Sequence, residues 1–129
     1  MENFDEWNIL KKTLNETETK VFFKEGEIWW VSIGQNIGEE TYGKGSKFRR
    51  PIIVFRKLTG NSCIAVPLTS KEREGTWYFK FEVDDVVRYA MMHQSRILST
   101  KRFESRIATM PEKDFKELKN AVGKFYNIL

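Results

Sequence analysis

The sequence predicts a mainly β protein: a small antiparallel SH3-like barrel with a C-terminal helix and an extra N-terminal helix. Short hydrophobic runs of strand-like composition follow one another, and turn-rich segments rather than long helices connect most of them. The length of 129 residues, 14% of them aromatic, fits one domain with a substantial core. We expect a helical extension over residues 1–22 and a barrel domain over residues 23–129.

The strongest strand signals lie between residues 24 and 70. A glycine-rich loop and a short hairpin turn separate three hydrophobic runs, which cover residues 26–33, 50–55 and 64–70. The loop occupies residues 34–49, and the hairpin turn at 58–62 contains Gly60 and Asn61. This spacing predicts consecutive antiparallel strands.

Further strands are predicted beyond residue 75. Residues 76–83 alternate apolar and polar side chains, which is the pattern of a half-buried strand. Its core-facing residues are expected to be Trp77, Phe79, Phe81 and Val83. A turn at residues 84–85 then leads to a fifth run over residues 86–94.

Helical periodicity is found near both ends of the chain. In the first 22 residues, apolar side chains recur at spacings of three and four: Phe4, Trp7, Leu10 and Leu14. Acidic residues come early in this segment and lysines later, which suits the helix dipole. We expect this helix to pack on the barrel or cover a sheet edge. Pro111 opens a last helix, and residues 99–103 suggest a short one.

Composition argues against several classes of protein. Charged residues make up 31% of the chain, and no apolar run approaches the roughly 20 residues of a membrane helix. The acidic N-terminal segment does not resemble a signal peptide, so we expect a cytoplasmic protein without membrane partners. The single cysteine, Cys63, lies in a strand-like run and is expected to be a buried, inert thiol.

The net charge of +4 is unevenly distributed. No acidic residue occurs between Thr41 and Lys71, whereas the cations of that stretch are Lys44, Lys47, Arg49, Arg50, Arg56, Lys57 and Lys71. Glycines and aromatic residues are interleaved with these charges and could serve as stacking surfaces. We interpret the stretch as a nucleic-acid-binding surface in preference to a merely solvated loop.

Few catalytic mechanisms are compatible with the remaining residues. One cysteine and one histidine cannot build a structural zinc site, and residues 43–47 lack the spacing of a Walker phosphate loop. Any Ser-His-Asp triad would have to use His93, and no nucleophile elbow accompanies it. No metal or cofactor is therefore expected. A nuclease of this composition would align a 2′-hydroxyl with phosphorus, stabilise the phosphorane with cations and transfer protons.

Several motifs between residues 24 and 125 resemble the MazF/PemK toxin family of ribosome-independent endoribonucleases. The matching segments are the opening strand at 26–31, the acidic segment at 36–40, the Arg-Pro strand at 50–54, the Pro-Leu-Thr-Ser segment at 67–70 and the Gln-x-Arg strand at 93–99. The loop before Arg50 is longer than in many members of that family.

The resemblance implies that Arg50 and Thr69 are catalytic. Because the pKa of arginine exceeds ~12, Arg50 is better suited to stabilise the phosphorane than to act as a base. Thr69 would donate a hydrogen bond to a non-bridging oxygen. The structural alternatives are a carbonyl-binding cation for Arg50 and a strand-end cap for Thr69.

His93 stands where one branch of the family has an acidic catalytic residue. Imidazole side chains suit proton transfer near neutral pH, so His93 is a catalytic candidate, with an ordinary strand residue as the alternative. Gln94 is expected either to hold a loop or to contact RNA. The full set of expected substrate-binding residues is Glu40, Lys44, Lys47, Arg49, Ser70 and Gln94.

The implied function is that of a toxin in a type II toxin–antitoxin pair. Such a toxin would be a metal-independent homodimeric endoribonuclease, cutting single-stranded mRNA to a 2′,3′-cyclic phosphate and a 5′-hydroxyl, and inhibited by a cognate antitoxin. One alternative is a CcdB-like gyrase inhibitor, against which the end of the chain counts, because residues 125–129 lack a Trp-Gly-Ile terminus. The other is a non-catalytic SH3-like module that binds RNA or protein.

Overall fold

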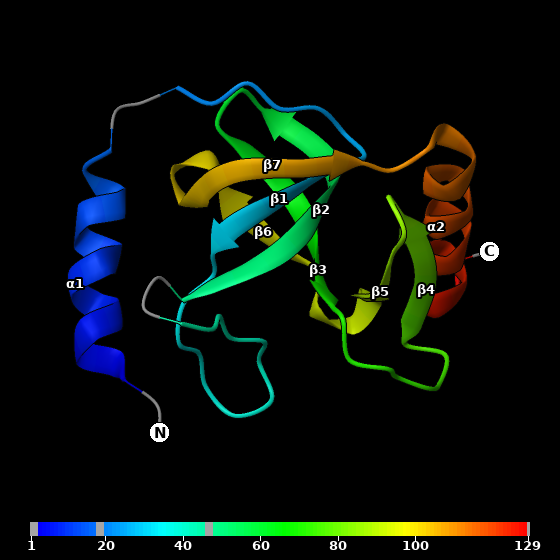
Figure 1. Ribbon diagram of the computed structural model, residues 1–129, viewed down its shortest axis with the longest axis horizontal. Coiled ribbons are helices and arrows are strands. Elements are labelled where there is room, and N and C mark those ends of the chain that lie inside the picture. Colours follow the sequence, from blue (N-terminus) through cyan, green and yellow to red (C-terminus); the bar gives the residue numbers. More distant parts are fainter. Residues whose placement is uncertain (1–2, 18–19, 46–47, 129) are drawn as a thin grey trace.

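The structure is a computed structural model that describes residues 3–17, 20–45 and 48–128. The helices are α1 (Phe4–Asn15) and α2 (Glu112–Phe125), with short 3-10 helices η1 (Met92–Gln94) and η2 (Thr100–Arg102). The strands are β1 (Glu27–Ser32), β2 (Arg49–Thr59), β3 (Ser62–Thr69), β4 (Tyr78–Val83), β5 (Val86–Met91), β6 (Arg96–Ser99) and β7 (Phe103–Thr109). Figure 1 shows the strands between α1 at one end of the molecule and α2 at the other.

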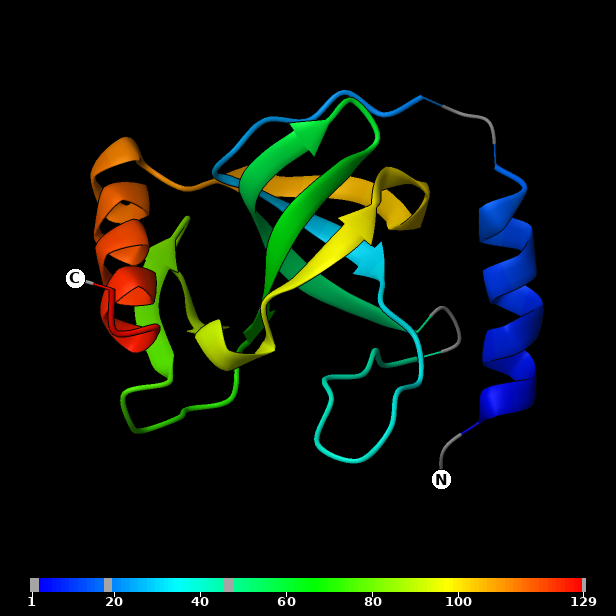
Figure 2. The same ribbon diagram turned by 180° about the vertical axis from the view of Figure 1, so that it is seen from behind.

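The described strands form one antiparallel sheet in the order β4-β5-β3-β2-β1-β7, with β6 paired to β3. The mainly β class predicted from the sequence is thus confirmed. The expected barrel is not closed, because β4 and β7 stand at opposite ends of this order and, in the described part of the chain, no ladder joins them. Figures 1 and 2 show the strongly curled sheet from both sides.

The central strand β2 is buried on both faces. Ile52, Ile53 and Val54 are each 0% exposed. Ile53 belongs to one core cluster, whereas Ile52 and Val54 belong to the other, because successive residues of a strand point to opposite faces. This double burial explains why the sequence shows a continuous apolar run here instead of alternation.

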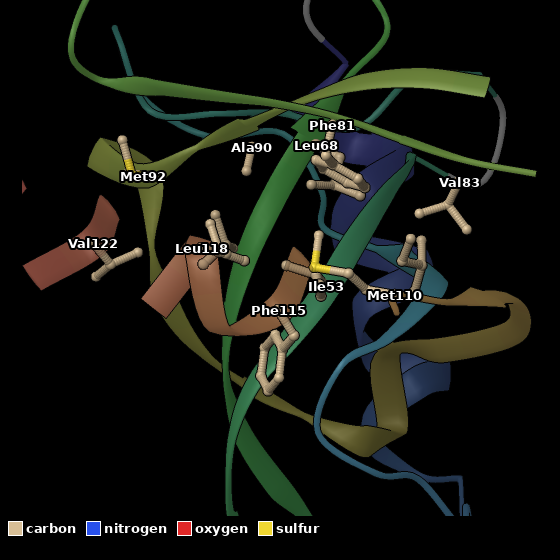
Figure 3. Packing of buried hydrophobic residues seen from close by; sticks show 12 residues of the cluster. Ile53, Leu68, Phe81, Val83, Ala90, Met92, Met110, Phe115, Leu118 and Val122 are labelled. Carbon is tan, nitrogen blue, oxygen red and sulfur yellow. The ribbon is translucent and has the colours of Figure 1, made fainter. Parts of the chain in front are cut away.

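The first core cluster lies between the sheet and α2 (Figure 3). Phe115, Leu118 and Val122 are spaced by three and four residues and form the buried stripe of α2. They pack against side chains of the central strands such as Ile53 and Leu68. The predicted C-terminal helix is therefore confirmed, with Pro111 as its N-cap residue.

The second core cluster lies on the opposite face of the central strands. It joins β-strand residues to Phe23 from the segment before β1 and to Phe103 at the start of β7, whose rings are 5.6 Å apart in an edge-to-face arrangement. Cys63 belongs to this cluster and is 0% exposed. Burial raises the pKa of its thiol to about 11, so little thiolate forms near neutral pH. The buried thiol was predicted correctly.

Two sequence-based boundaries were wrong. Trp77, expected in the core, is 55% exposed and precedes β4, whereas Phe81 and Val83 of that strand are buried. The strand predicted over residues 76–83 therefore starts before β4, which begins at Tyr78. The run 86–94 is a strand only as far as Met91, after which the chain turns into η1.

The expected N-terminal helix is present as α1, with Asn3 as its N-cap: the Asn3 side chain accepts a hydrogen bond from the Glu6 backbone N–H at 3.0 Å. Trp7 is its one buried residue, and the contacts of the helix are with the loop between β1 and β2 and with η2. Among the described residues, no helix combines the length and the apolar character that crossing a membrane requires.

Candidate functional site

The start of β2 and the end of β3 meet at one end of the central strands. These strands are antiparallel, with Ile52 opposite Pro67, and continuing that register by two residues brings Arg50 opposite Thr69. Arg50 Nη1 donates a hydrogen bond of 3.2 Å to the carbonyl oxygen of Leu68, the residue before Thr69, which holds the two strand ends together. Two residues that lie far apart in the sequence are therefore neighbours.

A pocket of about 650 Å³ opens at this end of the strands. Its lining residues come from β1, β2, β3, β5 and the loop before β2: Trp30, Lys44, Gly45, Arg49, Arg50, Pro51, Leu68, Thr69, Ser70, Val86 and Arg88. The lining is rich in cationic side chains, and no acidic side chain of the described residues contributes to it. Such a pocket attracts anions.

Arg50 lines the pocket and is held by two hydrogen bonds to backbone carbonyls. Its Nε donates a hydrogen bond of 2.8 Å to the carbonyl oxygen of Tyr42, in addition to the Nη1 bond to Leu68. The carbonyl-binding role considered as an alternative is thus real. A guanidinium has five N–H donors, however, so these two bonds leave donors for a ligand in the pocket. Two fixed contacts hold the orientation of those remaining donors.

The partly buried environment of Arg50 strengthens the interaction of its charge with an anion. Burial lowers the pKa of the guanidinium; Tyr42 acts in the opposite direction, and the positive charge of Arg73 lowers the pKa further. A partly desolvated cation interacts more strongly with an anion than one in bulk water, because the local dielectric constant is lower. Arg50 is therefore well suited to bind a phosphate.

Thr69 is the last residue of β3 and is 7% exposed. Its hydroxyl oxygen accepts a hydrogen bond of 3.2 Å from the backbone N–H of Lys71, which is the strand-end cap considered as an alternative. Accepting this bond leaves the hydroxyl proton available for donation. Ser70, beside it, is exposed and lines the same pocket. The capping contact fixes the Thr69 oxygen without using its donor.

Two further predicted binding residues line the pocket. Arg49 lies 4.8 Å above the ring of Trp30, and its Nε is 3.2 Å from Glu104 Oε2, although not aligned for a hydrogen bond. Lys44 is exposed and pairs through its backbone with Arg49. Lys47, also predicted to bind substrate, lies outside the described residues.

The remaining predicted residues lie in a second hollow of about 420 Å³. It is lined by Asn36, Glu40, Thr41, His93, Gln94, Ser95 and Arg96, and so shares no lining residue with the pocket of Arg50. The segment Thr41–Tyr42 connects the two, because Thr41 lines the hollow and the carbonyl of Tyr42 binds Arg50. The structure does not bring all predicted catalytic residues into one pocket.

Gln94 holds the loop between β1 and β2. Its side-chain oxygen accepts a hydrogen bond of 3.0 Å from the Thr41 backbone N–H, and its amide nitrogen donates one of 2.8 Å to the carbonyl of Glu39. Both ends of the amide are thus occupied. Glu40 is exposed, and its carboxylate accepts a hydrogen bond from the backbone N–H of Ile37 at 3.0 Å, closing a local turn.

His93 sits in an aromatic environment within the second hollow. Its ring centroid lies 5.1 Å from that of Trp77 and 5.2 Å from that of Tyr78. The Nδ1 atom is buried and has no hydrogen-bond partner among the described residues. An unpartnered buried polar atom is costly, so this nitrogen is a candidate for contact with a ligand.

The sequence analysis missed the contribution of β5 to the pocket. Val86 and Arg88 are two residues apart and therefore point to the same face of the strand, which lines the pocket. Burial lowers the pKa of the Arg88 guanidinium, with Asp84 acting in the opposite direction. The strand was predicted as part of the run 86–94, but its pairing with β3 was not visible in the sequence. Across the described residues, no group of His, Cys, Asp and Glu is arranged as a metal-ligand set.

The chain matches the family described as the PemK-like, MazF-like toxin of type II toxin-antitoxin system over residues 24–126, most of its length. It therefore belongs to the PemK/MazF-like toxin family, as the motifs predicted.

Solved structures with the same fold include members of this family. MazF from Deinococcus radiodurans superposes with a TM-score of 0.64 at 20% identity, covering 80% of this chain and 94% of that chain. A mycobacterial endoribonuclease in complex with its cognate antitoxin gives 0.60 at 12% identity, covering 81% and 95%. The Mycobacterium tuberculosis toxin MazF-mt6 gives 0.59 at 11% identity, covering 80% and 98%. Curated protein sequences give no match.

Proposed function

We propose that this chain is the toxin of a type II toxin–antitoxin pair and that it cleaves single-stranded mRNA as a metal-independent endoribonuclease. Family membership supports the toxin assignment. The observation that carries the activity is that Arg50 and Thr69 line the same cationic pocket, to which no acidic side chain of the described residues contributes. Donors fixed in advance around a developing negative charge are the main requirement for phosphoryl chemistry without covalent catalysis.

The reaction proposed for this pocket is an intramolecular transesterification of the RNA phosphodiester. The ribose 2′-oxygen attacks the adjacent phosphorus, the bond from phosphorus to the 5′-oxygen breaks, and a 2′,3′-cyclic phosphate forms. His93, the proposed proton carrier, accepts the proton of the 2′-hydroxyl, and its protonated form delivers a proton to the leaving 5′-oxygen. Arg50 stabilises the dianionic phosphorane, and Thr69 donates a hydrogen bond to one of its non-bridging oxygens.

The remaining predicted residues are assigned around this centre. Lys44, Lys47, Arg49 and Ser70 contact the RNA backbone beside the reacting phosphate. Glu40 binds the strand further along, and Gln94 supports this binding by holding the loop that carries Glu40. His93 is retained as the proposed proton carrier, and it would act through an intervening water because it does not line the pocket of Arg50. The support for His93 is its unpartnered Nδ1 in the second hollow.

The substrate is single-stranded because a nucleotide must be splayed from its neighbours for in-line attack and for stacking. Tyr42 and Trp30, which lie beside Arg50 and Arg49, provide the aromatic surfaces. We further propose that the toxin is a cytoplasmic homodimer whose cognate antitoxin inhibits it. A mycobacterial endoribonuclease of the same fold has been solved with its cognate antitoxin, which supports such a partner.

A non-catalytic RNA-binding module is the second candidate. It is favoured by the structural bonds that both central residues make, since Arg50 binds two backbone carbonyls and Thr69 caps a strand. Such a module would have the same cationic pocket and would bind RNA without turnover.

The deciding experiment is incubation of the purified chain with a long single-stranded RNA in EDTA, beside Arg50→Ala and Thr69→Ala. The proposal predicts site-specific fragments with 5′-hydroxyl ends that are lost in both variants. Intact RNA bound with a salt-dependent affinity would instead establish the binding module. Cleavage retained by both variants would place the reaction elsewhere in the molecule.

A further inference from the structure

The helix α1 contacts the loop between β1 and β2 at the two points where that loop begins and ends. The ring of Trp7 lies 5.5 Å from the ring of Phe48. At the other end of the loop, a Cβ atom added to Gly34 would lie 2.3 Å from the Trp7 indole, so the backbone and the indole touch directly. Trp7 is 6% exposed.

These two points are also the base at which the loop closes on itself. The carbonyl of Phe48 accepts hydrogen bonds from the backbone N–H groups of Ile33 at 2.9 Å and Gly34 at 3.2 Å. The carbonyl of Gly34 accepts one from Gly43 at 2.7 Å. Phe48 has a φ of 51°, an unfavourable value for a residue with a side chain, so its conformation needs support from its surroundings.

The loop base leads directly into the pocket. Arg49 and Arg50 follow Phe48 in the sequence, and Arg50 is bonded to the loop carbonyl of Tyr42. A hollow of about 460 Å³ lies between the first turn of α1 and the loop, and it shares Lys44 and Gly45 with the pocket of Arg50. A shift at the loop base would therefore move the pocket's cations.

The other end of α1 is fixed as well. Lys101 Nζ donates a hydrogen bond of 2.7 Å to the carbonyl of Asn15. Nearer the start of the helix, the guanidinium of Arg102 lies 5.6 Å from the Trp7 ring centroid. The helix lies at the end of the molecule that carries the loop, opposite α2 (Figures 1 and 2). It also precedes residue 24, where the family match begins.

We propose that Trp7 is a positioning residue for the reaction: by packing against Gly34 and Phe48, it locks the base of the β1–β2 loop and so orients Arg50 and Lys44 toward the RNA. This inference rests on the proposed function for its catalytic consequence. Its structural part, the locking of the loop, is independent of any activity. The N-terminal helix would thus contribute to catalysis by holding the loop in place, without contacting the RNA at the reacting phosphate.

The test compares Trp7→Ala, Trp7→Leu and Trp7→Phe with Ile9→Ala, a control on the same helix whose side chain is 67% exposed. Amide hydrogen exchange is measured for the loop-base amides of Ile33, Gly34 and Gly43, well below the unfolding temperature. Single-turnover RNA cleavage is measured alongside the affinity for a 2′-deoxy oligonucleotide.

Trp7→Ala is expected to raise exchange of the loop-base amides at least about tenfold, while the amides of the central strands keep their protection. The cleavage rate should fall about tenfold to a hundredfold at saturating RNA, because displacing catalytic groups by about 1 Å has effects of that size. Trp7→Phe should restore most of both properties, and Ile9→Ala should change neither.

Unchanged loop exchange in Trp7→Ala, or in Trp7→Leu if the alanine variant does not fold, would overturn the proposal. Faster exchange of the loop-base amides with an unaltered cleavage rate would also overturn it, because the order of the loop would then have no effect on catalysis. If the unmodified protein does not cleave RNA, the proposed function fails and the catalytic role of Trp7 fails with it, while the exchange result still decides the locking of the loop.

Discussion

The two hollows on either side of the segment Thr41–Tyr42 use similar polar side chains in different ways. In the second hollow, both ends of the Gln94 amide are bonded to the loop backbone. In the first, Arg50 and Thr69 are each fixed by backbone contacts and keep donors that these contacts do not use. The difference is the setting: Arg50 and Thr69 line a pocket rich in cationic side chains, whereas Gln94 holds the loop beside the other hollow.

The largest effect is expected for Arg50→Ala. It removes the charge that stabilises the phosphorane, and loss of one such group typically costs about 10²–10³ in rate. The loop loses the anchor of its Tyr42 carbonyl at the same time. Single-turnover cleavage measures the effect. Arg50→Lys keeps the charge but not the two-carbonyl fork, so it should recover little activity; full recovery would show that only the charge matters.

Thr69→Val is expected to lower the cleavage rate about 10²-fold, because a hydrogen-bond donor to the non-bridging oxygen is lost. The backbone N–H of Lys71 also loses its acceptor, which costs about 1 kcal/mol of stability. Thr69→Ser keeps the hydroxyl and should retain most of the rate. If valine and serine variants cleave equally well, Thr69 is a cap and nothing more.

His93→Gln tests whether the second hollow takes part in proton transfer. General acid–base groups contribute about 10²–10⁴ in rate, and the lower end, about 10², is expected here because His93 does not line the pocket of Arg50. Binding of a 2′-deoxy oligonucleotide should be unchanged. A variant with the full cleavage rate would leave the second hollow without a chemical role.

Gln94→Ala should have the smallest effect on catalysis and a visible one on stability. Two hydrogen bonds to the loop are lost, each contributing about 1 kcal/mol, so thermal unfolding should occur at a lower temperature. Exchange of the Thr41 amide should accelerate. A cleavage defect as deep as that of Arg50→Ala, with stability unchanged, would reverse the roles assigned to the two hollows.

The sequence predicted the hairpin that brings Arg50 and Thr69 together, because the turn signal at residues 58–62 separates two strand-like runs. Arg50 and Thr69 lie at the open end of this hairpin, and they come together because the two strands pair along their length from the turn onward. The family motifs pointed to the same residues. The two structural alternatives considered for these residues are also present, as the Leu68 carbonyl bond and the Lys71 cap show.

Features that depend on contacts between distant segments were not predictable. The bond between Gln94 and Thr41 spans 53 residues, and no spacing rule reports such a contact. The contribution of Arg88 required the pairing of β5 with β3. Trp77 was assigned to the core by alternation alone, although the strand begins after it and the ring packs beside His93 instead. β7 was not recognised because its residues 104–106 are polar and exposed.

The central claim is that Arg50 and Thr69 bind the reacting phosphate. The most direct test is a crystal structure of this chain with a 2′-deoxy oligonucleotide spanning its mapped cleavage site, because a substrate without the 2′-hydroxyl cannot react. The account predicts a phosphate within hydrogen-bond distance of both the Arg50 guanidinium and the Thr69 hydroxyl. A phosphate seated instead in the hollow of His93 and Gln94, with the first pocket empty, would contradict it.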